Sequence, residues 1–291
     1  GRQSSRFVTK LPMKDSEDEV RALLDKKVQV GAQEERPSVA GFLIICALSL
    51  FAVAGLMLVR RKVLPRLDIH LEDGEFTGAM MQSVMMFYGL AVALIAVSVW
   101  QTYSDTQKIV AGEATAIAVL YRNVSTYPEP HRNQLQATLK DYTRFVIDEA
   151  WPKHRQGLVA YGGVSHMSRM QEIFSAYEPI NASQKARHAV ALAEFNELLE
   201  ARRLRLDAVH TRVPGIMWGV VIIGALIGLT TSFFFKVGDV RLHYTLVGLL
   251  AAFIGLVMFM ILALDRPFRG DLGLSPESYQ LVYEQLMTTD L

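Results

Sequence analysis

The chain has 291 residues with a formal net charge of +1 at pH 7, and 51% of its residues are hydrophobic while only 20% are charged. This composition is too apolar for an ordinary soluble protein and too polar for a protein confined to the bilayer, so the chain is expected to occupy both environments. The small net charge excludes the strongly basic surface typical of nucleic-acid-binding proteins, and the single cysteine excludes an intrachain disulfide.

The chain opens with a polar segment and a first membrane span. Residues 1–38 are mixed in charge, and the apolar spacing within residues 15–30 predicts a short amphipathic helix. Residues 39–59 are apolar throughout and long enough to cross the ~30 Å hydrocarbon core. The basic cluster Arg60, Arg61 and Lys62 then ends the span, because charged side chains are costly to bury in lipid.

The second span is expected to continue into water as one helix. From Thr77 to Trp100 the sequence carries no charged residue, and from Gln101 to Arg122 it is polar but free of proline, with Gly112 as a weak interruption. At 1.5 Å per residue this helix would be roughly 70 Å long, more than twice the thickness of the hydrocarbon core. The sequence therefore predicts a rod that links a membrane bundle to a soluble bundle.

Soluble helices are expected to fill the interval before the third span. Pro128 and Pro130 end the long helix, and apolar spacing predicts further helices from residue 131 to the Trp151-Pro152 pair, at 165–177 and at 182–212. The inward face of the last helix is predicted to consist of six apolar residues: Ala189, Leu192, Phe195, Leu199, Leu206 and Val209.

Two further spans follow, at residues 213–235 and 244–264. The first of them carries small residues at four-residue spacing, which let helix backbones approach closely in a membrane: Gly215, Gly219, Gly224 and Gly228. Lys and Arg residues flank the spans on both sides, so charge alone leaves the membrane orientation open.

The predicted organisation therefore has five parts. They are a polar N-terminal segment (1–38), two spans (39–100), a soluble helical insert (101–212), two more spans (213–264) and a C-terminal segment with a short helix (265–291). The short helix is expected to begin at Ser275 and Pro276, residues that favour helix starts.

Several blocks of the sequence occur together in one known family. They are Trp100-Gln-x-Tyr103, Glu113-Ala-x-Ala-x-x-x-Leu120-Tyr-Arg122, Tyr142 with Glu149-Ala-Trp151-Pro152, Ala201-Arg-Arg-x-Arg205-Leu, Pro214 with Trp218, and Leu264-Asp-Arg-Pro-Phe-x-Gly270 with Ser275-Pro276. Through these blocks, residues from about 80 to 285 resemble the bestrophin-like membrane proteins of bacteria and plants, a family of unknown function distantly similar to bestrophins. One departure is Ala150, which separates Glu149 from Trp151 where the family has Glu-Trp-Pro.

The resemblance implies an all-α integral membrane protein of four spans, with a soluble helical insert between the second and third. It also implies a homo-oligomer, a pentamer by analogy, whose pore is lined by the second span and whose insert and termini are cytosolic. Bestrophins are anion channels, so inorganic anions are the expected permeant ions. The expected location is a bacterial inner membrane, with a plant organellar membrane as the alternative.

One face of the second span is the candidate pore lining. Its members recur at three- and four-residue intervals: Ser83, Phe87, Leu90, Leu94, Val97, Gln101 and Asp105. Such a face ordinarily serves packing. If subunits surround an axis, it would instead form an apolar constriction that gates by dewetting, with Gln101 and Asp105 at its wide polar end. The flanking residues Gly89, Ala93 and Ala96 are small enough for tight contact with neighbours.

The charged members of the family blocks are the second candidate group: Glu113, Arg122, Arg202, Arg203, Asp265 and Arg266. They are expected to form either ion pairs that tie the insert to the membrane edge or a ring of charge at the inner mouth of a pore.

No enzyme constellation is found in the sequence. It has no cysteine pair, HExxH motif or Walker loop, and no two histidines lie four residues apart. No catalytic site, cofactor or metal is therefore expected, and no nucleic-acid partner. Two functions remain: an ion channel, whose partners are the lipid bilayer, further copies of the chain and inorganic ions, or a non-conducting membrane scaffold or sensor whose insert binds a partner.

Overall fold

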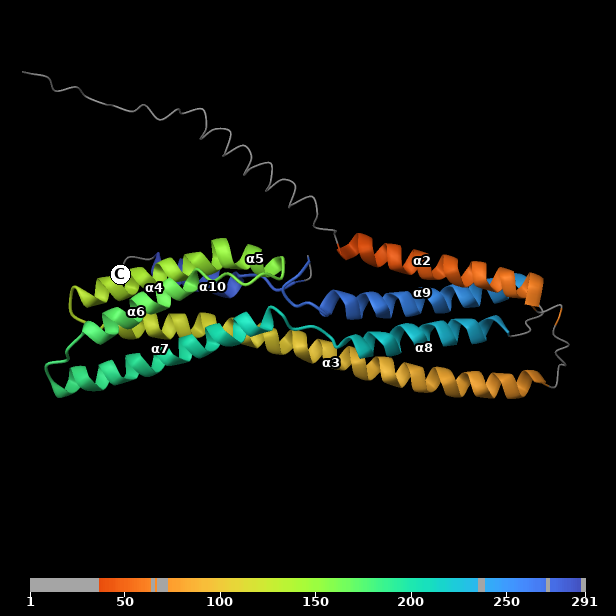
Figure 1. The fold of residues 1–291 in the computed structure, drawn as a ribbon, viewed down its shortest axis with the longest axis horizontal. Helices are drawn as coiled ribbons and strands as arrows, with labels where there is room; N and C mark the ends of the chain where they lie inside the picture. Colours follow the sequence, from red (N-terminus) through yellow and green to blue (C-terminus); the bar gives the residue numbers. More distant parts are fainter. Residues whose placement is uncertain (1–36, 64–65, 67–72, 235–238, 271–272, 289–291) are drawn as a thin grey trace, which may run out of the picture.

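The structure is a computed structural model that describes residues 37–63, 66, 73–234, 239–270 and 273–288. All regular structure in this part of the chain is helical, and the helices form two bundles that lie end to end (Figure 1). The amphipathic helix predicted at residues 15–30 lies outside the described residues.

Four helices are long and apolar enough to cross a membrane: α2 (Pro37–Leu58), α3 (Asp73–Val124), α8 (Gly215–Phe233) and α9 (Val240–Leu264). The prediction of four spans is therefore confirmed. Helix α9 packs against α2, α8 and α3, and buried residues such as Leu56, Leu229 and Ala251 fill the space between them. The π-helical turn Val59–Val63 carries the basic cluster that follows the first span.

Helix α3 is one unbroken helix of 52 residues, Asp73–Val124, which confirms the predicted rod. At 1.5 Å per residue it is roughly 78 Å long. It starts among the membrane helices and ends in the second bundle, so the same helix belongs to both (Figure 1). It has no loop near Trp100, where the apolar half gives way to the polar half.

The second bundle is the predicted insert together with the C-terminal segment. Its helices are α4 (His131–Phe145), α5 (Trp151–Arg155), α6 (Gly163–Ala176), α7 (Ala182–Ala208) and α10 (Glu277–Val282), with π-helical turns at Val146–Ala150 and Tyr283–Met287. The polar half of α3 packs between α7, α4 and α10. One continuous core joins them, with Leu120, Leu139, Phe174 and Phe195 among its buried residues.

The helix that begins at residue 131 was predicted to end at Trp151-Pro152. In the structure helical geometry continues to Arg155. A proline in an α-helix normally clashes with the preceding turn. Here the turn Val146–Ala150 is π-helical, and the Trp151 N–H bonds the Val146 carbonyl five residues earlier. This wider turn accommodates Pro152, and the chain leaves the helix only at Gln156.

The predicted inward face of the long insert helix was only partly correct. Of the six predicted residues Phe195 is buried, and Leu199 and Val209 are partly buried against the same core. The rest of the buried stripe of α7 consists of Ala191, Leu198, Arg205 and Ala208. The buried stripe includes the charged residue Arg205, so apolar spacing alone does not reveal it. The helix ends at Ala208 rather than at residue 212, before the chain turns into the membrane through Pro214.

Candidate functional site

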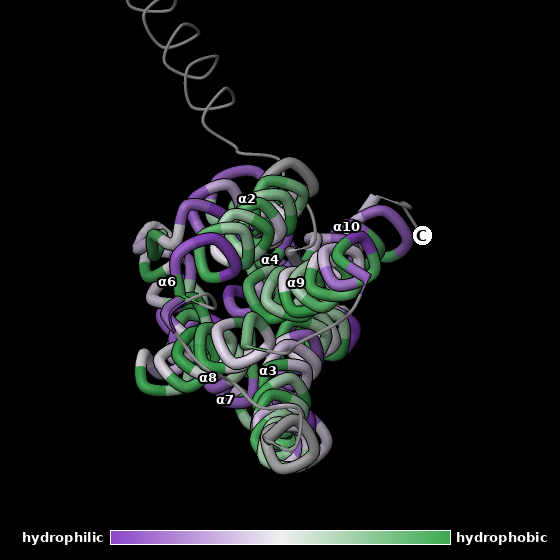
Figure 2. Tube along the Cα trace, turned by 90° about the vertical axis from the view of Figure 1, so that its right-hand side faces the viewer, coloured by the Kyte–Doolittle hydropathy of each residue, from purple (hydrophilic) through white to green (hydrophobic). Residues whose placement is uncertain are grey.

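The membrane half of α3 has one covered face and one uncovered face. Val92, Ile95 and Val99 are buried against α8 and α9, and the Tyr88 hydroxyl donates to the Val221 carbonyl at 3.1 Å. Seen along the bundle, α3 lies at one edge of the membrane helices (Figure 2). The face turned away from the bundle has no partner among the described residues.

The seven candidate pore residues all lie on this uncovered face, and all are exposed in the single chain: Ser83, Phe87, Leu90, Leu94, Val97, Gln101 and Asp105. Phe87 is 70% exposed and Leu94 is 64% exposed, although both are large and apolar. Towards the insert the face becomes polar, and Asp105 pairs with Lys108 at 2.9 Å. The uncovered face is thus an apolar stripe that ends in charged and amide side chains.

A groove runs beside this stripe, between α3 and α9. Its cavity volume is about 410 Å³, and its α3 wall includes Gly89, Ala93 and Ala96 while Phe253 and Val257 belong to its α9 wall. A Cβ added at Gly89 would meet no atom within 4 Å. The small flanking residues therefore leave an open apolar surface next to the candidate pore face.

The four glycines of α8 fall into two pairs. Gly224 and Gly228 lie against α3, where a Cβ would collide with the Tyr88 ring and the Met85 sulfur respectively. Gly215 and Gly219 have no neighbouring atom within 4 Å of such a Cβ. Gly215 and Gly219 therefore have no packing partner within the described chain.

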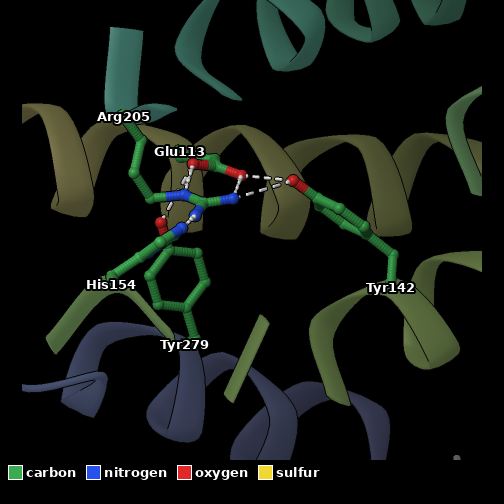
Figure 3. A network of polar contacts seen from close by, with 5 residues as sticks. All are labelled: Glu113, Tyr142, His154, Arg205 and Tyr279. Carbon is green, nitrogen blue, oxygen red and sulfur yellow. Dashed lines mark hydrogen bonds and ion pairs between the residues drawn. The ribbon is translucent and has the colours of Figure 1, made fainter. Parts of the chain in front are cut away.

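In the second bundle, five helices converge on a buried polar cluster that consists of Glu113, Tyr142, His154, Arg205 and Tyr279 (Figure 3). These residues come from α3, α4, α5, α7 and α10 in that order. Glu113 is 0% exposed and Arg205 is 1% exposed. We refer to these five residues as the polar cluster.

The carboxylate of Glu113 accepts all its hydrogen bonds from this cluster. Its Oε2 accepts from Arg205 Nε at 2.5 Å and from Tyr279 Oη at 3.1 Å. Its Oε1 accepts from Tyr142 Oη at 2.5 Å and from Arg205 Nη2 at 3.2 Å. Arg205 Nη1 lies 3.3 Å from both ring nitrogens of His154. A buried ion pair is tolerated only when its remaining donors and acceptors are satisfied in this way.

The surroundings fix the protonation states of the cluster. Burial raises the pKa of Tyr142 and of Tyr279, and the negative charge of Glu113 raises both further, so both hydroxyls remain donors. Burial, followed by the charge of Arg205, lowers the pKa of His154 to about 3 and keeps the imidazole neutral. Burial is the largest single influence on the pKa of Arg205 and lowers it, but Glu113, Tyr279 and Tyr142 act together in the opposite direction, and the net effect raises the pKa.

The structure does not join the six predicted charged residues into one network. Glu113 pairs with Arg205, which belongs to one of the family blocks but is not one of the six predicted residues. Arg203 approaches Asp207 at 3.9 Å on the surface of α7. Asp265 accepts a hydrogen bond from the Val213 N–H at 2.6 Å and so ties the end of α9 to the start of α8. The three remaining residues lie apart from these contacts: Arg122 and Arg266 are exposed and Arg202 is half-buried.

Sequence reasoning therefore missed four of the five residues of the polar cluster. A signal was available for Arg205, because Ala191, Phe195, Leu198 and Arg205 recur at the spacing of one helix face. An arginine in phase with core residues indicates a buried partner. For His154, which lies just after the unexpected π-helical turn, the sequence gave no comparable sign.

Comparison with known proteins places the chain among helical membrane proteins. A family model of the bestrophin-like domain matches residues 46–279. A point variant of a bacterial bestrophin homolog from Klebsiella pneumoniae has the same fold, with a TM-score of 0.64 at 12% identity over 87% of this chain and 99% of that chain. A second variant of that protein gives 0.63 at 13% identity over 86% and 99%. A crystal structure of a membrane protein gives 0.64 at 13% identity over 87% and 98%. No curated protein matches the sequence. Identities this low establish the shared fold alone.

Proposed function

The chain belongs to the bestrophin-like family, and we propose that it is a homo-oligomeric ion channel whose pore is lined by the uncovered face of α3. The family and the all-helical fold of four spans with an insert are those predicted from the sequence. The observation that carries the proposal is the exposure of Phe87, Leu90, Leu94 and Val97 on one side of a helix whose other side packs on its own bundle.

Around a central axis, copies of this stripe would form stacked apolar rings. A narrow apolar constriction excludes water and ions when it is tight and admits them when it widens slightly. Gln101 and Asp105, one and two turns beyond the last apolar ring, would provide the polar, wider end towards the insert. The insert helices would then surround a vestibule at this end.

The groove beside the stripe supports an arrangement around an axis. If the stripe faces the axis, the flanking small residues Gly89, Ala93 and Ala96 face the neighbouring subunit. Small residues allow close helix contact in membranes, where packing rather than the hydrophobic effect holds helices together. We propose a pentamer by analogy with bestrophins.

Anion conduction is the finer part of the proposal, and it rests on the family relationship. The membrane we propose is a bacterial inner membrane, because a protein of the same fold comes from Klebsiella pneumoniae; a plant organellar membrane is the alternative. The reversal potential in asymmetric potassium chloride tests selectivity. A reversal potential near that of potassium would contradict anion conduction.

The decisive experiment is conductance of the purified protein in planar bilayers. Leu94→Ala widens the proposed constriction and is expected to raise the open probability. Leu43→Ala is the matched control, since Leu43 is 60% exposed on α2, away from the proposed axis. Equal behaviour of the two variants, or no current under varied ions, voltage, pH and calcium, would count against the channel.

The rival function is a scaffold or sensor whose insert binds a partner. It is favoured by a polar groove of about 950 Å³ between α4 and α6, lined by residues such as Gln134, Asp141, Arg169 and Glu172. Particle symmetry in detergent separates the two functions. Cyclic symmetry of order four or more with α3 innermost supports the channel, whereas a monomer or dimer supports the scaffold.

A further inference from the structure

A basic pocket lies where the insert meets the membrane spans. We define it by Arg212, Arg266, Arg269 and His210, which line one cavity of about 350 Å³ together with Gly157 and Thr211. Its walls come from three separate connections: those between α5 and α6, between α7 and α8, and between α9 and α10. None of the proposed pore residues lines this cavity.

The pocket lies beside the insert-side ends of two membrane spans. Arg212 precedes Pro214, the residue before α8, and Arg266 comes two residues after Leu264, the last residue of α9. Both spans therefore have their insert-side ends beside the cavity. The hydrogen bond from the Val213 N–H to Asp265 at 2.6 Å holds these two ends together.

The backbone at Gln156 and Gly157 contacts the guanidinium of Arg269. Arg269 Nη2 donates to the Gln156 carbonyl at 3.0 Å. Gly157 has φ 75°, and a Cβ added there would collide with the guanidinium of Arg269. A side chain at Gly157 would thus be strained and would also displace this guanidinium. The exposed Arg269 side chain is thus directed to the pocket by one backbone hydrogen bond and by the room that Gly157 leaves for its guanidinium.

The charged side chains among the described residues that line the pocket are arginines. None of the described residues that line it is acidic, and the ion pairs found in the described chain involve Lys108, Arg132, Arg203 and Arg205 instead. Burial, followed by the charge of Arg266, lowers the pKa of Arg269. Gathering like charges is unfavourable, and a bound anion would relieve the repulsion.

We propose that the basic pocket binds a phosphate group, presented either by the headgroup of an anionic lipid or as inorganic phosphate. Guanidinium groups bind phosphate oxygens through paired hydrogen bonds, and three of them converge on one cavity. The position at the ends of α8 and α9 brings the cavity within reach of a lipid phosphate. This binding is independent of whether the protein conducts ions.

The test uses the full chain in nanodiscs of phosphatidylcholine alone and of phosphatidylcholine with phosphatidylglycerol. Native mass spectrometry counts retained lipids, and calorimetry with inorganic phosphate is run in the phosphatidylcholine discs. Arg266→Gln/Arg269→Gln is compared with Arg203→Gln/Arg187→Gln, which removes the same charge from the exposed surface of α7. Gly157→Ala keeps every charge but displaces the Arg269 guanidinium.

A headgroup site predicts that phosphatidylglycerol is retained by the wild type and by the α7 control. The pocket double variant and Gly157→Ala should lose it by roughly tenfold or more. An inorganic phosphate site predicts the same pattern in calorimetry without a lipid preference. If the pocket variants and the α7 control behave alike in both measurements, the proposal is overturned. Because Gly157→Ala keeps every charge, a loss of binding in this variant distinguishes a site that depends on the position of Arg269 from general attraction to positive charge. Unfolding curves show that each variant is folded.

Discussion

Replacing Glu113 by glutamine should strongly destabilise the insert. The substitution removes the countercharge of Arg205, which is 1% exposed and bonded to Glu113 at 2.5 Å through Nε. A glutamine also has one acceptor oxygen, whereas the carboxylate receives hydrogen bonds from Arg205, Tyr142 and Tyr279 on both oxygens. Leaving one partner of a buried ion pair uncompensated costs about 3–5 kcal/mol.

Thermal unfolding of the purified protein in detergent measures this loss. For a folded unit of about 150–250 residues, a loss of 1 kcal/mol in the free energy of unfolding lowers Tm by about 2–4 °C. Glu113→Gln should therefore lower Tm by roughly 6–20 °C. Trp151 reports on the insert, because its ring centroid is 5.7 Å from that of Tyr279 and its Nε1 donates to the Leu274 carbonyl. The control is Arg203→Gln, which breaks only an exposed contact at 3.9 Å and should change Tm little.

The double variant Glu113→Gln/Arg205→Met separates charge from packing. Methionine at position 205 removes the buried guanidinium that would otherwise lack a countercharge. The glutamine amide can still exchange hydrogen bonds with the hydroxyls of Tyr142 and Tyr279. The double variant should therefore be more stable than Glu113→Gln alone. Two results would refute the reasoning: a Glu113→Gln shift no larger than that of Arg203→Gln, or a double variant that is less stable than the single one.

Two further predictions concern the histidine of the polar cluster and the glycines of α8. The pKa of His154 is about 3 in the folded protein and about 6.5 in an unfolded chain, so protonation of the unfolded state should reduce stability as pH falls from about 6.5 towards 3. The Tm of the wild type should drop more between pH 7 and pH 5 than the Tm of His154→Gln, and parallel curves would contradict this. Gly224→Leu should cost about 1–3 kcal/mol by overpacking against Tyr88, whereas Gly219→Leu, in open space, should leave Tm unchanged. Equal Tm losses would contradict the packing, and a changed oligomeric state for Gly219→Leu would assign that face to a subunit contact.

The membrane architecture was predictable because its signal is local. An apolar run as long as the bilayer is thick has few alternatives to a membrane helix, and the absence of proline between Thr77 and Arg122 favoured one continuous helix. The break at Pro128 and Pro130 was equally local. Where a local rule has an exception, as at the π-helical turn before Pro152, the prediction failed.

The polar cluster was not predictable in the same way because its logic is tertiary. Arg205 can be buried only because Glu113 lies 92 positions earlier on a helix that packs against α7, and Tyr279 lies a further 74 positions beyond Arg205. The basic pocket has the same character. Arg212 and Arg266 stand on either side of two membrane spans and meet only when α8 and α9 run back to the same surface.

If the protein gates as proposed, the polar cluster constrains which parts can move. The polar half of α3 is bound to four other helices through Glu113 and its partners, and breaking the ion pair costs about 3–5 kcal/mol. The membrane half is held mainly by apolar contacts, together with the Tyr88–Val221 hydrogen bond, and borders an open groove of about 410 Å³. Separating the polar half of α3 from the other helices of the second bundle is therefore the costlier motion. Opening should move the insert and α3 as one body, with the displacement taken up between α3 and the groove wall on α9.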